Sequence, residues 1–323
     1  MQRAVFRPPG RNRPCSIHGM VRVVAVFVAV VLSTVAAAQE RGRGAQRKAP
    51  DMLAAQVLVD RAGFSPGEID GNGGTNTDNA IDAYQRVTGK QVADLVAASQ
   101  DPPTTKYTIT AADASVPLVR SIPQDMEAKA RLKRLNYTSL LEMLGEKFHA
   151  SPALLKRLNP RLRLGAGQEI VVPNVIVVSD AEGKPQPDAV IHVSKSSSTL
   201  WVTDGAGKTI MHAPVTSGSE HDPLPIGTWT VTAVSRNPTF NYNPELFWDA
   251  NPSHSKAKIP PGPNNPVGVV WIDLSKEHYG IHGTPEPSTI GHTESHGCVR
   301  LTNWDALRLA AMVGKGTKVE FVE

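Results

Sequence analysis

The sequence predicts a multidomain protein in which a β-rich C-terminal domain follows two small units that contain helices. Short apolar or alternating runs separated by turn residues fill residues 188–323, which is the pattern of a β-rich domain. Apolar residues with helical spacing recur instead in 51–90 and in 136–175. The length of 323 residues allows two or three domains, and contents of 40% hydrophobic and 20% charged residues are typical of globular chains.

Residues 1–38 have the features of a secretory signal peptide. Arg22 and earlier arginines precede an apolar run over 23–35, and residues 36–38 offer an A-x-A cleavage site. A helix that spans a bilayer needs roughly 20 residues, so this shorter run makes an uncleaved anchor the weaker alternative. Met20 is an alternative start to Met1. We expect a linker over 39–50 and export of the mature protein to the periplasm, without a membrane span after cleavage.

Removal of that segment changes both the charge and the cysteine content of the chain. Residues 1–38 carry five arginines and no acidic residue, so the formal net charge falls from +4 to −1 without them. The basic pI therefore gives no support for a nucleic-acid partner. Cys15 leaves with the signal, and Cys298 becomes the only thiol. A lone thiol in an oxidising compartment is reactive or joined to another chain, with a buried, inert thiol as the remaining alternative.

Residues 51–90 are predicted to form a small helical unit. Leu53 and Val57 have helical spacing, and Thr77 is a candidate N-cap of a second helix that ends near Gly89. The stretch 56–90 contains the turn D-G-x-x-G-x-N-T followed by A-I-x-A-Y-Q. It resembles the short helical peptidoglycan-binding domain. This resemblance implies binding to glycan strands, although such a unit can also fold without glycan affinity.

A connector and a second helix-bearing unit follow. Several prolines in 91–135 predict a connector with some extended segments. Residues 136–175 show two helical patterns, then L-N-P at 158–160 and G-Q-E-I-V-V-P at 167–173. This order resembles a LysM module and implies a grip on N-acetylglucosamine chains. The glycine-aspartate-threonine turn of that family's first strand is missing.

Residues 188–323 are predicted to form one β-rich domain. Thr302, with Asp305 three residues later, gives a capping-box pattern for a helix that ends near Gly314. The continuous apolar run 267–272 is typical of a strand buried on both faces. Strands are predicted over 189–193, 200–203, 209–215, 228–234, 267–272 and 317–322, with a hairpin turn at 204–207.

The chemistry of this domain is predicted to centre on Cys298. A free thiol has a pKa near ~8.5, so a nucleophilic cysteine needs a base to take its proton and hold the resulting ion pair. His282 and His296 are the candidate bases. His296 is only two residues away, in cramped geometry, whereas His282 ends a strand-like segment that the chain can return beside. We therefore expect His282 to be the general base and His296 to face substrate or support the structure.

The residues just before Cys298 are predicted to form a pocket for an oxyanion. Gly297 lets the backbone turn sharply and exposes the N–H groups around the cysteine. Such N–H groups stabilise the charge that develops when a thiolate attacks a carbonyl. Ser295 and His296 are expected to complete this pocket.

Two further positions have predicted roles in orientation and binding. The carbonyl of Gly283 is a candidate acceptor for the second imidazole N–H of His282. Asp273 and Glu294 are alternative orienting groups. Arg300 is placed to bind a substrate carboxylate through its planar fork, or to form a structural salt bridge.

A zinc site is the alternative for this histidine-rich segment, because histidine and cysteine side chains bind Zn²⁺. The i,i+4 histidine pairs would bring ligands together only on a helix, and the glycines and prolines of 280–297 argue against one. We therefore expect no metal. The candidate ligands in this alternative are His278, His282, His292, His296 and Cys298.

Residues 188–323 resemble the L,D-transpeptidase catalytic domain of the YkuD family. The residues that carry the resemblance are His282, the S-H-G-C-V-R-L motif at 295–301 and P-I-G-T at 225–228. The resemblance implies a β-rich fold with mixed β-sheets and a helix toward its C-terminal side.

The same resemblance implies a reaction. In this family the cysteine attacks the carbonyl between diaminopimelate and the terminal D-alanine of a tetrapeptide stem; D-alanine leaves, and an amine resolves the thioester. Cys298 is then the nucleophile, His282 the base and Gly283 the carbonyl that orients it, while His296, Gly297 and Arg300 complete the pocket. No metal or organic cofactor is implied, and the partner is peptidoglycan of the cell wall.

No readable motif selects the acceptor among a diaminopimelate of another stem, a lipoprotein lysine, a free D-amino acid and water. A carboxypeptidase or endopeptidase that hydrolyses the same bonds is one alternative function. A wall-binding scaffold without activity is the other.

Overall fold

The computed structural model describes residues 51–161, 163–177 and 184–323. The signal peptide and the linker predicted over 1–38 and 39–50 lie outside these residues, and so does Cys15. Within the described ranges, no helix is both long and apolar enough to cross a membrane.

Three helices form the first unit: α2 (Met52–Arg61), α3 (Thr75–Thr88) and α4 (Val92–Ala98). The second helix ends as expected at Gly89, whose φ of 69° is left-handed. The prediction that Thr77 caps this helix is wrong, because α3 begins at Thr75, after Gly74. The buried Thr77 hydroxyl instead accepts a hydrogen bond of 3.1 Å from Nε2 of Gln56, which ties α3 to α2.

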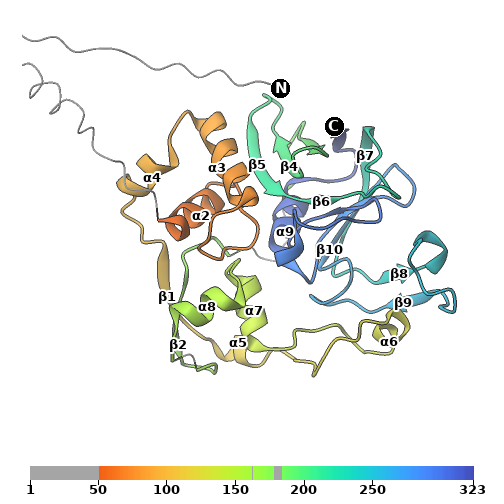
Figure 1. The fold of residues 1–323 in the computed structure, drawn as a ribbon, viewed down its shortest axis with the longest axis horizontal. Helices are drawn as coiled ribbons and strands as arrows, with labels where there is room; N and C mark the ends of the chain where they lie inside the picture. The colour runs from red at the N-terminus through yellow and green to blue at the C-terminus, as the bar shows by residue number, and fades with distance from the viewer. Residues whose placement is uncertain (1–50, 162, 178–183) are drawn as a thin grey trace, which may run out of the picture. The chain divides into compact units, whose positions relative to one another are not determined.

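The second unit pairs β1 (Thr104–Thr108) with β2 (Glu169–Pro173) in an antiparallel sheet (Figure 1). The chain between these strands forms α5 (Ala111–Ala114), α6 (Met126–Ala130), α7 (Leu140–Lys147) and α8 (Pro152–Leu158). The strand β1 comes from the segment predicted as a connector, and it supplies the pairing partner that 136–175 lacks. The core of this unit also includes Val57 and Ile69 from the first unit, so the two units share buried side chains.

A nine-stranded mixed sheet organises the C-terminal domain, with the strand order β5-β4-β3-β13-β7-β10-β11-β12-β6. Strand β3 pairs in parallel with β13, and β11 pairs in parallel with β12, whereas the other neighbours are antiparallel. This mixed, β-rich architecture confirms the predicted fold class of the domain. The strands are β3 (Val190–Ser194), β4 (Thr199–Thr203), β5 (Thr209–Pro214), β6 (Thr216–Ser217), β7 (Gly227–Arg236), β10 (Val270–Leu274), β11 (Gly280–His282), β12 (Val299–Arg300) and β13 (Lys318–Val322).

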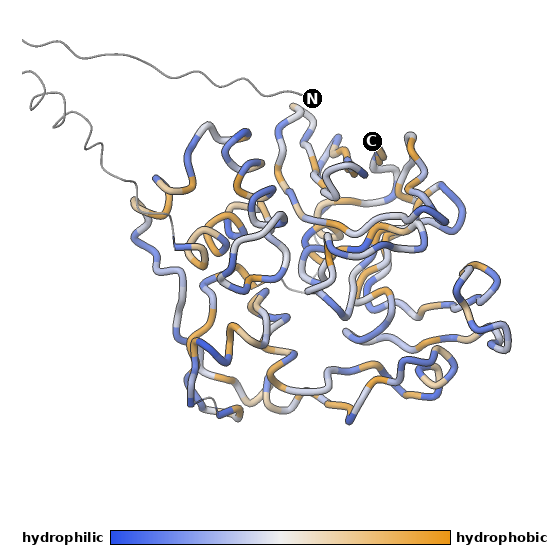
Figure 2. The backbone as a smooth tube through the Cα atoms, in the orientation of Figure 1, coloured by the Kyte–Doolittle hydropathy of each residue, from blue (hydrophilic) through white to orange (hydrophobic). Residues whose placement is uncertain are grey.

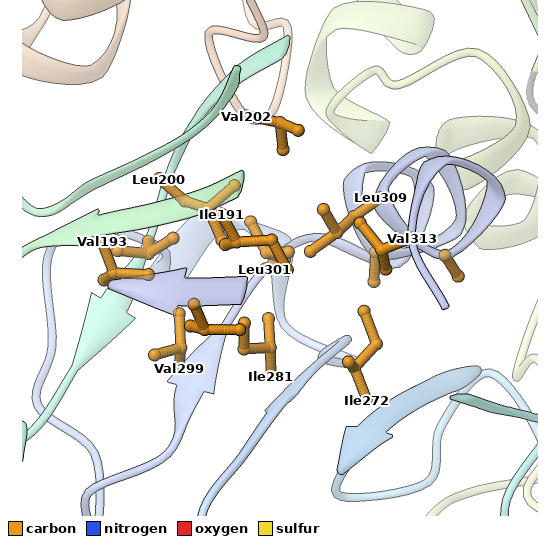
Figure 3. Close-up of a cluster of buried hydrophobic side chains, with 14 of the residues drawn as sticks. Ile191, Val193, Leu200, Val202, Ile272, Ile281, Val299, Leu301, Leu309 and Val313 are labelled. Atoms are coloured by element: carbon orange, nitrogen blue, oxygen red, sulfur yellow. The ribbon is translucent and has the colours of Figure 1, made fainter. Parts of the chain in front are cut away.

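The helix α9 (Asn303–Met312) packs against β10 and β11. Thr302 caps it as predicted, because its hydroxyl oxygen accepts a hydrogen bond of 3.2 Å from the backbone N–H of Asp305. Leu309 of the helix is fully buried in the same cluster as Ile272 of the sheet (Figure 3). Each such side chain contributes about 1.5–3 kcal/mol on burial. Figure 2 shows hydrophobic segments along the packed strands and helices.

The strand predicted over 267–272 begins later than expected, as β10 at Val270. Gly268 has a φ of 63°, a left-handed conformation that interrupts an extended run. The expectation of burial on both faces is also wrong. Trp271 and Asp273 alternate with buried residues and stay partly exposed, as on a strand with one face in the core.

A buried cluster of charged groups joins the first unit to the second unit and to α9. Nη2 of Arg308 lies 3.3 Å from Oδ1 of Asp60, and Nη1 lies 3.5 Å from Oδ1 of Asp305. Asp60 also contacts Nδ1 of His149 at 3.1 Å, and Ser65 donates a hydrogen bond of 2.8 Å to Asp305. Removal of one partner from a buried ion pair costs about 3–5 kcal/mol, so this cluster fixes three parts of the chain together.

The segment 236–266 extends from the sheet as a small hairpin with its own core. Tyr242 and Ile259 of this hairpin pack with Leu135 from the predicted connector. The hairpin contains β8 (Phe240–Tyr242), the 3-10 helix η1 (Pro244–Leu246) and β9 (Ala257–Ile259), and a second 3-10 helix, η2 (Pro287–Thr289), lies between β11 and β12.

Candidate active site

The parallel pairing of β11 with β12 brings the predicted site residues together. Ile281 lies opposite Val299, and His282 lies opposite Arg300. Side chains alternate between the two faces of a strand, and Ile281 and Val299 are fully buried in the core. His282 and Arg300 therefore face away from that core, and Cys298, two residues before Arg300, lies on their side.

The His282 imidazole is buried and has one tautomer. Its Nδ1 lies 2.7 Å from the carbonyl oxygen of Gly283. Because a carbonyl only accepts, Nδ1 carries the proton and Nε2 keeps its lone pair for a thiol. The ring stacks on the indole of Trp271 with centroids 5.5 Å apart. Burial lowers the pKa of His282 to about 4, so the ring is neutral at neutral pH.

The Cys298 thiol is only partly exposed, and its proton points at a backbone carbonyl. Sγ lies 3.8 Å from the carbonyl oxygen of His278. Burial raises the pKa of the thiol to about 11, although the backbone N–H of Gly280 and the charge of Arg300 both act to lower it. Burial thus disfavours the charged forms of both groups, the thiolate and the imidazolium.

Two glycines allow aromatic rings to approach the site closely. Gly297 has a φ of 94°, and a Cβ there would lie 2.7 Å from Cε1 of Tyr279. A Cβ on Gly280 would lie 2.5 Å from Cζ2 of Trp271. Real Cβ atoms essentially never approach within 3.0 Å of another heavy atom. Any larger residue at either position would displace a ring that borders the site.

Ser295 fixes the backbone of the cysteine loop. Its buried hydroxyl donates a hydrogen bond of 2.6 Å to the carbonyl oxygen of Cys298 and accepts one of 2.7 Å from the backbone N–H of Gly218. Its own N–H donates to the carbonyl oxygen of Gly218 at 3.0 Å. These contacts use the hydroxyl within the protein, so Ser295 supports the pocket from behind.

His296 contacts the hairpin segment 236–266. Its Nε2 lies 2.8 Å from Oδ1 of Asp249. Its ring lies 5.1 Å from that of Phe247 and 5.9 Å from that of Trp248, centroid to centroid. Trp248 is 61% exposed and also stacks on His221 at 4.5 Å. The sequence does not predict these partners, because the segment 236–266 has several aromatic residues but no motif that indicates a contact with His296.

Arg300 keeps its charge available at the site. No carboxylate of the described residues lies within 4.0 Å of its guanidinium, so the alternative of a structural salt bridge finds no partner there. Glu286 and Asp249 act on it only at longer range. A partly buried guanidinium beside Cys298 is suited to bind a carboxylate of a substrate.

The alternative orienting groups lie elsewhere. Asp273 accepts hydrogen bonds from the hydroxyl of Thr232 at 2.8 Å and from the indole N–H of Trp271 at 3.3 Å. It therefore acts on His282 only through the stacked indole. Glu294 is exposed. Across the part of the chain that the structure describes, no three His, Cys, Asp or Glu side chains are grouped to hold a metal ion.

Residues 188–321 match the YkuD family, described as the L,D-transpeptidase catalytic domain. A putative L,D-transpeptidase YkuD of Bacillus subtilis is 31% identical over 183 residues, which cover 55% of this chain and 91% of the relative. A probable L,D-transpeptidase YbiS of Escherichia coli is 32% identical over 145 residues, 42% of this chain and 46% of the relative.

Solved structures give a weaker likeness. The crystal structure of L,D-transpeptidase 3 from Mycobacterium tuberculosis with a faropenem-derived adduct has a TM-score of 0.36 and 17% identity, over 50% of this chain and 76% of that one. An L,D-transpeptidase from Mycobacterium smegmatis has a TM-score of 0.34 and 19% identity, over 42% of this chain and 59% of that one.

Proposed function

This chain belongs to the L,D-transpeptidase family, and we propose that it transfers acyl groups of peptidoglycan stem peptides through a thioester on Cys298. The observation that carries the proposal is the arrangement of three side chains on one side of β11 and β12. His282 offers Nε2 as a base because Gly283 holds its other nitrogen, and Arg300 places a positive charge beside the thiol.

The first half of the reaction forms the thioester and releases D-alanine. Sγ of Cys298 attacks the carbonyl carbon between diaminopimelate and D-alanine while Nε2 of His282 takes the thiol proton. Backbone N–H groups around Gly297 stabilise the oxyanion. The C–N bond then breaks, and the proton on His282 passes to the amine of D-alanine.

The second half transfers the acyl group to an acceptor. An amine attacks the thioester carbonyl and His282 takes its proton; the C–S bond then breaks, and His282 passes the proton to Sγ, which restores the thiol. Because burial disfavours both the thiolate and the imidazolium, the proposed proton transfer accompanies the attack. Arg300 binds a carboxylate of the donor stem and fixes its register.

We also propose that the protein is exported to the periplasm and acts at the cell wall. The signal-like residues 1–38 support export. The units over 51–90 and 136–175 support binding to glycan strands, because each resembles a wall-binding module. Neither unit contributes a nucleophile or a base to the site, so glycan binding would position the enzyme and leave the chemistry to Cys298.

Purified protein, tetrapeptide-bearing muropeptides and mass spectrometry test this function. We expect dimers joined directly between two diaminopimelate residues, with loss of one D-alanine for each dimer. Tripeptide monomers without dimers would show that the enzyme hydrolyses the bond and does not transfer the acyl group, which is the carboxypeptidase alternative. Unchanged muropeptides would contradict both activities and leave a wall-binding scaffold.

A further inference from the structure

Asn303, the first residue of α9, holds the turn that precedes β10. Its side chain is 1% exposed. Oδ1 accepts a hydrogen bond of 3.1 Å from the backbone N–H of Val269. Nδ2 donates to Oε2 of Glu146 at 2.8 Å and to the carbonyl oxygen of Pro263 at 3.2 Å. The amide thus has partners on both its oxygen and its nitrogen.

The same amide presses against the peptide that orients the catalytic histidine. A Cβ on Gly283 would lie 2.3 Å from Oδ1 of Asn303, and one on Gly268 would lie 2.1 Å from it. The N–H of Gly283 is also fixed, at 3.2 Å from the carbonyl oxygen of Val270. The Gly283 carbonyl that receives the Nδ1 proton of His282 therefore belongs to a backbone segment packed on Asn303.

Glu146 brings the second unit into this arrangement. It lies on α7, 157 residues before Asn303 in the sequence. Its Oε1 accepts a hydrogen bond of 2.8 Å from the hydroxyl of Tyr137, and its Oε2 accepts the one from Asn303. Each carboxylate oxygen has one donor, so Glu146 fixes the direction of the Asn303 amide and determines which of its atoms faces Gly283.

We propose that Glu146 and Asn303 are positioning residues for the reaction, which set the Gly283 peptide and through it the tautomer and direction of the His282 ring. This inference rests on the proposed function of His282 as the general base. The LysM-like unit is then a structural part of the catalytic centre, in addition to any glycan that it binds.

An exchange of the two side chains tests the proposal in the full chain. Asn303→Asp removes the Nδ2 donor to Glu146 and to the Pro263 carbonyl. It should lower kcat about 10- to 100-fold with little change in KM, because misplacement by about 1 Å costs up to ~10²-fold in rate. In Glu146→Gln/Asn303→Asp the hydrogen bond between the two side chains reverses its direction while the donor to the Pro263 carbonyl stays lost, so kcat should recover part of that loss.

Glu142→Gln is the matched control. Glu142 lies on the same helix and accepts a hydrogen bond of 2.6 Å from Asn264, but it does not contact Asn303. Its kcat per reactive thiol should stay at the level of the unchanged protein. A Glu142→Gln loss equal to that of Asn303→Asp, or no recovery in the double variant, would overturn the proposal.

A second measurement does not depend on acyl transfer. The Nδ1 proton of His282, hydrogen-bonded to Gly283, should give a downfield imidazole N–H resonance in NMR spectra, assigned by its loss in His282→Gln. We expect this resonance to shift or exchange away in Asn303→Asp and to return in the double variant. The same resonance in all variants would overturn the positioning role, whereas a responsive resonance in a protein without acyl transfer would contradict only the proposed function.

Discussion

The two strands that carry the chemistry and the hairpin that borders them are built in different ways. His282 and Arg300 occupy paired positions of adjacent strands, and the residues that precede them on these strands, Ile281 and Val299, are buried in the main core. The hairpin segment 236–266 has a small core of its own and reaches the site through exposed groups such as Trp248. Sheet register thus positions His282 and Arg300, whereas the hairpin, which we call the rim of the site, is held to it by a few side-chain contacts.

The largest effect should come from the strand pair itself. Cys298→Ala removes the nucleophile without a change in the backbone, and we expect acyl transfer to fall by about 10⁴-fold or more. Intact-mass spectrometry with a β-lactam or a tetrapeptide donor checks whether a covalent adduct forms. An adduct on the variant would show that another group carries the acyl chain. The reacting group would then lie outside the segment next to β12, which would contradict the contrast drawn between strands and hairpin.

Loss of the base should have the next largest effect. His282→Gln keeps a polar side chain of similar length but has no group that takes a proton from the thiol, so we expect kcat/KM to fall about 10²- to 10⁴-fold. Steady-state assays with a matched His296→Gln variant measure the difference between the two histidines. An equal loss in both variants would place His296 in the chemistry and erase its assignment to the rim.

The pH dependence of Cys298 alkylation tests the neutral pair. A thiol whose pKa is raised to about 11 is protonated at neutral pH. As long as the pH stays below that pKa, the fraction of reactive thiolate rises about tenfold for each unit by which the pH increases. We expect the alkylation rate with iodoacetamide to rise about 100-fold from pH 7 to pH 9, without a plateau. A plateau that begins below pH 7 would mean a thiolate–imidazolium pair in the free enzyme.

The smallest effect should come from the rim. Asp249→Asn weakens the contact with His296 but leaves the strand pair unchanged, and an exposed pair of this kind contributes about 0–1 kcal/mol. We expect kcat/KM to change by less than about fivefold, with the larger part in KM. Kinetics with two amine acceptors of different size measures this. A loss above a hundredfold would make the hairpin part of the chemical step.

Local sequence signals were enough for several elements of the fold around the candidate site. The spacing of His282 and the S-H-G-C motif predicts residues that the sheet register places on one side. Thr302 caps α9 as its pattern indicates, because capping depends only on residues three positions apart.

The missed features depend on partners far away in the sequence. Thr77 was predicted as a cap, but the distant Gln56 engages its hydroxyl. The contact of His296 with Asp249 spans 47 residues, and that of Asn303 with Glu146 spans 157. No local pattern specifies such pairs, because tertiary packing alone brings them together. The raised pKa of Cys298 has the same kind of origin, since it follows from burial, which no local pattern specifies.

The buried contact of Asp60 with Arg308 bears on how such a protein can evolve by recombination. Here an exchange that replaced the helical unit would also remove Asp60 and leave Arg308 with a single buried counter-charge, on Asp305. Crossovers that preserve folding must therefore carry both ends of this pair together, so the helical unit and α9 are inherited as one block.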